Sequence, residues 1–268
     1  MATPEIDLDR VHGDYRRDGY AAPVNLMTPR EAARHRAALE RAEAEVGNLH
    51  YKPKIHTILR SPFELATLPV VLDIVERLVG PDILLYNATY IIKEPGTASH
   101  VSWHQDLPYW GLSQDDQVTM WLALSPATAE SGCMRMIPAS HTNGHVEHEV
   151  TEDASNVLYQ GQTVRGIDEQ EAVMCPLRPG QASFHHGWTL HASMPNNSND
   201  RRIGLNVQYI AAHVRQTKHD LDSAMLVRGR DDFHHFETDI AAGADFEPTA
   251  MARQVALEDR YRQIAGTS

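Results

Sequence analysis

A histidine and an aspartate two positions apart, in the segment SWHQDLPYW, have the residue types of a metal site. His104 and Asp106 lie in sequence that reads as a strand, where residues i and i+2 point to the same face and can contact one ion. An imidazole and a carboxylate suit a divalent first-row metal, and a second imidazole would complete a 2-His-1-carboxylate site with open coordination positions. Three other pairs have this spacing but lack strand-like context or a downstream histidine: His12/Asp14, His145/Glu147 and His235/Glu237.

The third ligand has three candidates in the segment HHGWTLHASMPNNSNDRR: His185, His186 and His191. The residues that follow His191 favour it. Ser193 would share a strand face with His191, and Arg202 begins the next strand after a turn-rich PNNSND connection. A hairpin-like return would bring Arg202 near the metal, where its planar guanidinium can bind a carboxylate through two hydrogen bonds. The pattern therefore predicts a metal ion beside an anion site.

The order of these motifs along the chain resembles that of the phytanoyl-CoA dioxygenase family of iron(II)/2-oxoglutarate oxygenases. The resemblance covers roughly residues 14–208 and also includes KEPG at 93–96, WLAL at 121–124 and ESGCMRMIPASH at 130–141. It implies a double-stranded β-helix, which is a cupin-like jelly roll. It also implies that His104, Asp106 and His191 are the ligands of Fe(II).

The resemblance further implies a set of cosubstrate contacts and a reaction. 2-Oxoglutarate would chelate the iron, Arg202 would bind its distal carboxylate, and Ser193 would assist Arg202. Trp121 stands at a position that lies beside the cosubstrate in relatives. Related halogenases have a small residue in place of the aspartate, which frees a coordination position for chloride. Asp106 therefore favours hydroxylation with O2 and conversion of 2-oxoglutarate to succinate, with no catalytic side chain beyond the metal ligands.

Two other functions are compatible with the same residues. The first is an enzyme that uses another divalent metal, such as zinc or nickel, on the same fold. The second is a metal-binding jelly-roll protein without oxygenase activity. In either case a substrate or ligand cannot be identified from the sequence beyond a small molecule.

Residues that bind the substrate are expected near the metal strand, where aromatic rings offer apolar surface with a polar group. Core packing is the alternative for each ring. An arginine in the CMRMI segment would meet an anionic substrate if its face of the strand points inward. The candidates are Trp103, Tyr109, Trp110 and Arg135.

Short segments rich in β-branched and aromatic residues, separated by turn signals, predict the strands that must position these side chains. Their ranges are 83–93, 103–106, 118–124, 133–137, 181–185 and 202–210. Thr28, Pro29 and Glu31 predict a capping box at the start of a helix that runs to about Gly47. Apolar spacing predicts a second helix over about 71–78, and the tail predicts a third over about 249–264. The fold is expected to be mainly β with flanking α-helices.

The last predicted strand, RIGLNVQYI, alternates apolar and polar residues. One face carries four apolar side chains and would pack on the core: Ile203, Leu205, Val207 and Tyr209. Arg202 shares the other face with Asn206 and Gln208. The polar face is therefore expected to look toward the metal.

Length and composition set the broad class. The chain has 268 residues, 42% of them hydrophobic and 22% charged, as in a globular protein. A net charge of −12 argues against nucleic acid as a partner, and no apolar run is long enough for a membrane helix. The opening residues lack the apolar stretch of a signal peptide, and two cysteines, Cys133 and Cys175, are too few for a disulfide framework. A cytoplasmic protein is expected.

One oxygenase domain is expected over 1–268, because no linker or repeat divides the chain. It would comprise a helical N-terminal segment (1–82), a jelly-roll core (83–212) and a C-terminal cap with a helix (213–268). The expected partner is a small-molecule substrate. Monomer and homodimer both remain open.

Overall fold

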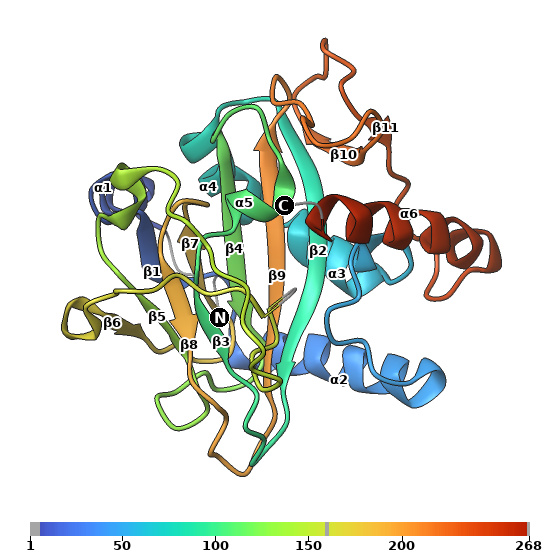
Figure 1. Ribbon diagram of the computed structural model, residues 1–268. Coiled ribbons are helices and arrows are strands. Elements are labelled where there is room, and N and C mark those ends of the chain that lie inside the picture. The colour runs from blue at the N-terminus through green and yellow to red at the C-terminus, as the bar shows by residue number, and fades with distance from the viewer. Residues whose placement is uncertain (1–5, 159–160, 267–268) are drawn as a thin grey trace.

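The computed structural model describes residues 6–158 and 161–266, and its centre is a pair of β-sheets (Figure 1). In this described part, the larger sheet has the strand order β1-β7-β4-β9-β2-β10-β11 and the smaller sheet β3-β8-β5-β6. This is the mainly β, jelly-roll type of architecture that the sequence predicts. The strands are β1 (Tyr20–Asn25), β2 (Ile83–Lys93), β3 (Val101–His104), β4 (Gln117–Ala123), β5 (Met134–Met136), β6 (Val173–Cys175), β7 (Gln181–His185), β8 (His191–Ser193), β9 (Arg202–Ala211), β10 (Ser223–Arg228) and β11 (Glu237–Thr238).

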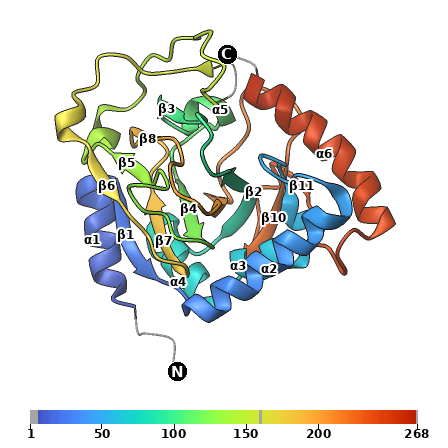
Figure 2. The ribbon, with the colours of Figure 1, turned by 90° about the horizontal axis from the view of Figure 1, so that it is seen from below.

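Helices flank the sheets, and Figure 2 shows α2, α3 and α4 on the outer side of the larger sheet. Their apolar residues share one core with β2, β4, β7 and β9. Over residues 6–158 and 161–266, no helix combines the length and the apolar character that crossing a membrane requires. The α-helices are α1 (Leu8–Asp18), α2 (Pro29–Val46), α3 (Arg60–Ala66), α4 (Pro69–Val79), α5 (Leu107–Trp110) and α6 (Pro248–Gly266).

The predicted helices are confirmed. At the start of α2, the Thr28 hydroxyl accepts from the Glu31 N–H at 3.3 Å, and the Glu31 carboxylate accepts from the Thr28 N–H at 2.8 Å. This reciprocal pair satisfies two N–H groups that the first turn leaves free. Gly47 and Gly80 follow the ends of α2 and α4, as the sequence signals indicate.

Most of the predicted strands are confirmed, and one is corrected. The predictions for β2 and β7 match in both bounds, those for β4 and β5 differ by one residue at each end, and that for β9 differs by one residue at its C-terminal end. However, β3 ends at His104, and Asp106 has helical backbone angles at the start of the short α5. Pro108 near the start of α5 favours this early change from strand to helix. His104 and Asp106 are therefore not two residues of one strand.

The expectation of a helical segment over 1–82 is incomplete. This part of the chain also supplies β1, which pairs with β7 at one edge of the larger sheet. At the other side, β10 from the C-terminal region pairs with β2. Strands from the N-terminal and C-terminal regions therefore add to the larger sheet on either side of the predicted core strands.

The alternation predicted for β9 is confirmed. Its four apolar side chains lie in the core against the helices: Ile203, Leu205, Val207 and Tyr209. Arg202, Asn206 and Gln208 line a cavity on the opposite face of the sheet. One strand therefore divides its residues between the core and the cavity.

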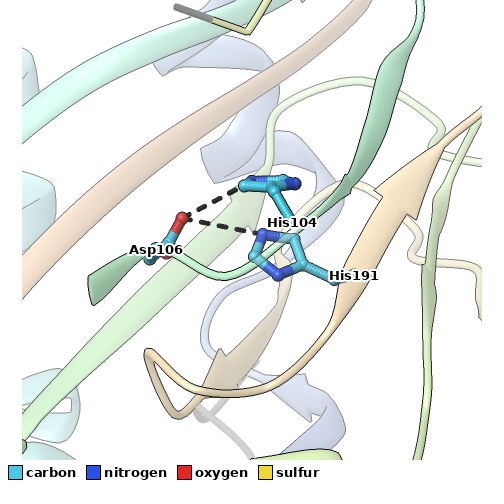
Figure 3. A group of neighbouring side chains, drawn as sticks. All are labelled: His104, Asp106 and His191. Atoms are coloured by element: carbon cyan, nitrogen blue, oxygen red, sulfur yellow. Dashed lines mark ion pairs between the residues drawn. The ribbon is translucent and has the colours of Figure 1, made fainter. Parts of the chain in front are cut away.

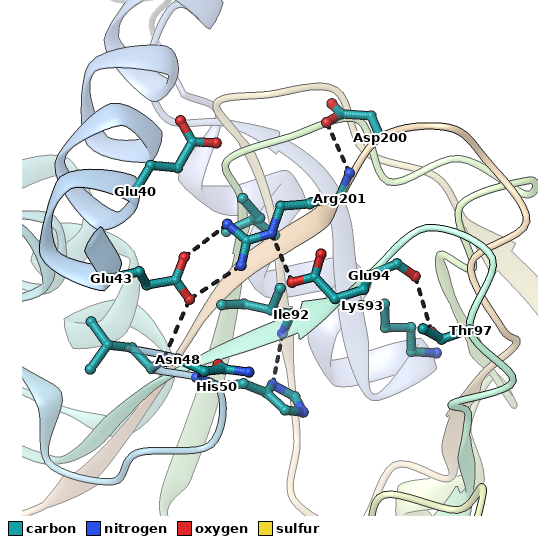
Figure 4. A network of polar contacts seen from close by, with 12 residues as sticks. Glu40, Glu43, Asn48, His50, Ile92, Lys93, Glu94, Thr97, Asp200 and Arg201 are labelled. Atoms are coloured by element: carbon teal, nitrogen blue, oxygen red, sulfur yellow. Dashed lines mark hydrogen bonds and ion pairs between the residues drawn. The ribbon is translucent and has the colours of Figure 1, made fainter. Parts of the chain in front are cut away.

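An ion-pair network joins α2 to the start of β9 (Figure 4). The Arg201 guanidinium lies 2.8 Å from the Glu43 carboxylate and 2.9 Å from that of Glu94, which follows β2. Arg36 of α2 binds both carboxylate oxygens of Asp200 at 2.7 Å. Arg201 thus has a structural role on the outer face, and its neighbour Arg202 points the other way.

Candidate active site

Three side chains from β3, β8 and the start of α5 lie close together. His104 at the end of β3 and His191 at the start of β8 are a Cα pair across the smaller sheet. The Oδ1 atom of Asp106 lies 3.6 Å from Nε2 of His104 and 3.7 Å from Nε2 of His191. The ligand atoms of the three residues all lie within 4.8 Å of one another (Figure 3). The structure therefore brings together the three predicted metal ligands, although Asp106 comes from a helix start.

Backbone carbonyls orient both imidazoles. Nδ1 of His104 lies 2.9 Å from the carbonyl oxygen of Ser102, and Nδ1 of His191 lies 2.9 Å from that of Thr189. A carbonyl oxygen can only accept, so each Nδ1 donates its N–H to a carbonyl, and each Nε2 is the ring nitrogen that faces Asp106. Burial, followed by the charge of His104, holds the pKa of His191 well below its usual range. The Nε2 atoms of two imidazoles and a carboxylate oxygen fit the donor set of a divalent first-row metal.

Two residues of the larger sheet hold the other oxygen of Asp106. The Thr119 hydroxyl donates to Oδ2 at 2.9 Å, and Nε2 of His185 lies 3.4 Å from the same atom. Burial opposes ionisation of Asp106, but the contacts with His104 and His185 hold its pKa well below its usual range. His185, a candidate third ligand in the sequence, thus contacts a ligand and is outside the group of three.

Arg202 is buried at the start of β9, with 1% of its surface exposed. Among the described residues, its Nε, Nη1 and Nη2 atoms have no hydrogen-bond partner. The Trp121 ring centre lies 5.0 Å from the guanidinium carbon, and both side chains line the cavity that contains the three metal-ligand candidates. Burial lowers the pKa of Arg202 to about 10, so the side chain is a cation at neutral pH. A cation with no partner in such a place is a site for an anion.

Lys93 is a second buried basic residue here, and the sequence reasoning assigned it no role. It ends β2 as the Cα partner of Arg202, and its Nζ atom donates to the Ser193 hydroxyl at 2.7 Å. Burial, followed by the charge of Arg202, lowers the pKa of Lys93 to about 6. Ser193 was expected to assist Arg202, but its hydroxyl contacts Lys93. The signal for Lys93 was its place in the KEPG segment, as the last residue of a buried strand.

The cavity has a volume of about 300 Å³ and extends from Arg202 past the metal-ligand candidates. Tyr109 and Trp110 of α5 line it, as predicted, and α6 contributes Tyr261. The other lining residues mix polar and apolar groups, including Tyr51, Asn87, Thr89, Ile91, Val101, Met134, His185, Ala192, Asn206 and Gln208.

The other two substrate-binding candidates, Trp103 and Arg135, do not line this cavity, and their assignment is corrected. Arg135 lies over the Trp103 ring at 5.1 Å, and both side chains contact the Glu169 carboxylate. The cause is strand alternation, because His104 and Met134 point into the cavity and their sequence neighbours point out of it. The pair forms a largely buried ion-pair and stacking cluster outside the cavity.

The chain is similar in sequence to a known family and to several curated proteins. Residues 15–204 match the sequence model of the phytanoyl-CoA dioxygenase (PhyH) family. A probable alpha-ketoglutarate-dependent hypophosphite dioxygenase of Stutzerimonas stutzeri is 29% identical over 144 residues, which are 53% of this chain and 50% of that protein. Human peroxisomal phytanoyl-CoA dioxygenase is 26% identical over 157 residues, 56% of this chain and 46% of that protein. The chain spans about half the length of these curated relatives.

Solved structures share the fold over nearly the whole chain. The apo form of the non-heme monooxygenase ThoJ is 31% identical, with a TM-score of 0.85 and 97% of each chain covered. The epimerase SnoN, solved with Fe3+ and alpha-ketoglutarate, shows the same fold at 21% identity, with a TM-score of 0.65 over 90% of this chain and 95% of its own. The family model matches more than half of the sequence, and the chain therefore belongs to the phytanoyl-CoA dioxygenase family.

Proposed function

We propose that this protein is an iron(II)- and 2-oxoglutarate-dependent oxygenase that hydroxylates a small molecule. The observation that carries the proposal is the unpaired, buried guanidinium of Arg202 in the same cavity as His104, Asp106 and His191. A dicarboxylate that reaches from the metal to Arg202 supplies the missing partner. Its binding would satisfy a buried cation that otherwise raises the free energy of the folded protein.

The metal ligands would be Nε2 of His104, Nε2 of His191 and Oδ1 of Asp106. These three atoms leave open coordination positions for a chelating cosubstrate and for O2. When bound, the iron with O2 supplies the oxidising chemistry, and 2-oxoglutarate is converted to succinate and CO2. Because Asp106 is present, no coordination position is freed for a halide, which supports hydroxylation over halogenation.

The remaining residues position the cosubstrate and shield it. Arg202 binds the distal carboxylate through two hydrogen bonds, and Lys93 places a second donor next to it. The Trp121 ring packs against the guanidinium and keeps water from it. Tyr109 and Trp110 bound the substrate side of the cavity.

The test is the visible charge-transfer band of the anaerobic protein with Fe(II) and 2-oxoglutarate. We expect a weak band in the wild type and a diminished band in Arg202→Ala at the same 2-oxoglutarate concentration. Arg201→Ala is the matched control, because Arg201 points to the outer face, and its band should be unchanged. Absence of the band in the wild type would refute the proposed function, and an undiminished band in Arg202→Ala would remove that residue from its role.

We also propose that the partner is a small molecule and that the protein works in the cytoplasm. The net charge of −12 disfavours association with nucleic acid. Cys133 and Cys175 are buried free thiols, which a reducing compartment maintains. A cavity of about 300 Å³ matches the lower range of sites for small ligands.

A further inference from the structure

Four polar side chains form one row across the inner face of the larger sheet. Their Cα atoms are partners in register from strand to strand, so the side chains lie side by side on one face. In the order β7, β4, β9, β2, they are His185, Thr119, Gln208 and Asn87. The first two contact Asp106, as described above. The other two continue the row away from the metal centre.

Gln208 and Asn87 each present an unpaired polar atom in this row. Both side chains line the cavity, and they are 4% and 1% exposed. Among the described residues, neither Oε1 of Gln208 nor Nδ2 of Asn87 makes a well-formed hydrogen bond, and the Tyr261 hydroxyl of α6 is the polar group beside both amides. A buried amide group without a partner costs folding free energy of about 1–3 kcal/mol. A ligand that fills the cavity can provide these bonds.

The orientation of the Asn87 amide is fixed by its neighbour. Its oxygen accepts from the backbone N–H of Lys54 at 2.7 Å. Because a backbone N–H can only donate, the atom that faces it must be the oxygen, and the NH2 group must face the cavity. Asn87 therefore offers a donor to a ligand, and Gln208 beside it offers the second hydrogen bond.

The end of the cosubstrate that Arg202 holds lies far from these amides. Lys93 and Arg202 are Cα partners, and Asn87 and Gln208 are Cα partners six residues further along the same two strands. At about 3.3 Å per residue, the Cα atoms of the two pairs lie roughly 20 Å apart, so the carboxylate bound to Arg202 is remote from the two amides. Gln208 is instead the neighbour of Thr119, at about the 4.8 Å spacing of adjacent strands, and thus lies next to the Asp106 contact.

We propose that Asn87 and Gln208 bind an uncharged group of the substrate that has both a hydrogen-bond acceptor and a donor, as a carboxamide does. This inference rests on the proposed function, because it assigns the substrate side of the same cavity. The Asn87 NH2 group disfavours an ammonium, which has no acceptor. The Oε1 atom of Gln208 needs a donor, which a carboxylate lacks.

The experiment compares three probes that share a benzyl group and differ in the polar end: 2-phenylacetamide, phenylacetate and 2-phenylethylamine. Binding is followed by ligand-observed NMR with the full chain, Zn(II) as a diamagnetic, inactive metal, and 2-oxoglutarate. We expect 2-phenylacetamide to bind at least tenfold more tightly than the other two probes. In Gln208→Leu and Asn87→Asp, its affinity should fall at least tenfold. Asn87→Asp keeps an oxygen for the Lys54 N–H and replaces the NH2 donor with a carboxylate oxygen.

Gln170→Leu is the matched control, since Gln170 is exposed outside the cavity, and its probe affinities should equal those of the wild type. Absence of 2-phenylacetamide binding, tighter binding of a charged probe, or unchanged affinity in both variants would overturn the inference. Those results leave the proposed function intact if 2-oxoglutarate still binds. Failure of 2-oxoglutarate to bind the wild type counts against the proposed function instead.

Discussion

Lys93 and Arg202 face each other as a Cα pair across β2 and β9, and both side chains are buried on the face that holds the cavity. Within residues 6–158 and 161–266, Arg202 has no hydrogen-bond partner, and the recorded partners of Lys93 are neutral oxygens. Two neighbouring basic groups without an anion destabilise the folded state. Binding of an anion at this end of the cavity should therefore lower the free energy of the folded protein.

Replacement of Arg202 by methionine should separate stability from binding. Loss of a desolvated, unpaired charge should leave the free energy of unfolding unchanged or raise it by up to about 2 kcal/mol. The affinity for 2-oxoglutarate should fall about tenfold to a hundredfold, because hydrogen bonds to a charged group are lost. Urea unfolding and anaerobic calorimetry measure the two effects.

Arg201→Met is the control for this prediction. Loss of the ion pairs with Glu43 and Glu94 should lower the free energy of unfolding by about 1 kcal/mol or less and leave 2-oxoglutarate affinity unchanged. A destabilised Arg202→Met variant that still binds 2-oxoglutarate normally would show that Arg202 is structural.

The protonation of Lys93 should make cosubstrate binding depend on pH. Its pKa of about 6 in the free protein means that the amine is mostly neutral at pH 7.5. A bound carboxylate raises this pKa, so binding takes up a proton above pH 6, and affinity falls as pH rises, by up to tenfold per unit. Calorimetry at pH 7.5 in two buffers with different ionisation enthalpies should detect the uptake. The same uptake in Lys93→Met would assign the proton to another group.

Thr119 should support metal affinity without being a ligand. Thr119→Val keeps the shape of the side chain and removes the hydrogen bond to Oδ2 of Asp106. Such partners of metal ligands typically contribute tenfold to a hundredfold in metal affinity, and we expect a loss in this range for Co(II) in equilibrium dialysis. Thr97→Val, at an exposed hydroxyl that donates to Glu94, should bind Co(II) as the wild type does. Equal affinities of the two variants would contradict the prediction.

Gly204 should be intolerant of a side chain, since a Cβ atom there would overlap the Trp121 ring. Gly204→Ala should lower the free energy of unfolding by about 1–3 kcal/mol through overpacking, and it should weaken 2-oxoglutarate binding by displacing Trp121 from Arg202. Gly13→Ala, in α1 with no atom near the new Cβ, should raise stability by about 0.5–1 kcal/mol. Denaturant unfolding of both variants decides the matter, and a neutral Gly204→Ala would disprove the steric role.

Local sequence signals were sufficient for several of the elements and for the polar face of β9. Capping residues, turn pairs and period-two alternation depend on near neighbours, and they placed α2, β2 and β7 correctly. The metal ligands were found by type and order. The prediction that His104 and Asp106 are close together is confirmed. The reason given for it was wrong, because β3 ends at His104 and Asp106 lies at the start of α5.

The residues that were missed depend on pairing between distant strands. The role of Lys93 depends on the strand register that places it opposite Arg202. The role of Asn87 depends on the register that aligns it with Gln208 and Thr119. No single segment encodes such register. The misplacement of Arg135 has the same origin, since the inward face of β5 was not determined by its sequence.

The alternation along β9 has a consequence for how such proteins diversify. Odd-numbered positions from 203 to 209 pack in the core, whereas Asn206 and Gln208 on the other face line the cavity. Mutations that retune selectivity can therefore accumulate on one side of a single strand with little penalty on the other. Directed evolution toward new substrates would best begin with a combinatorial library at Asn206 and Gln208.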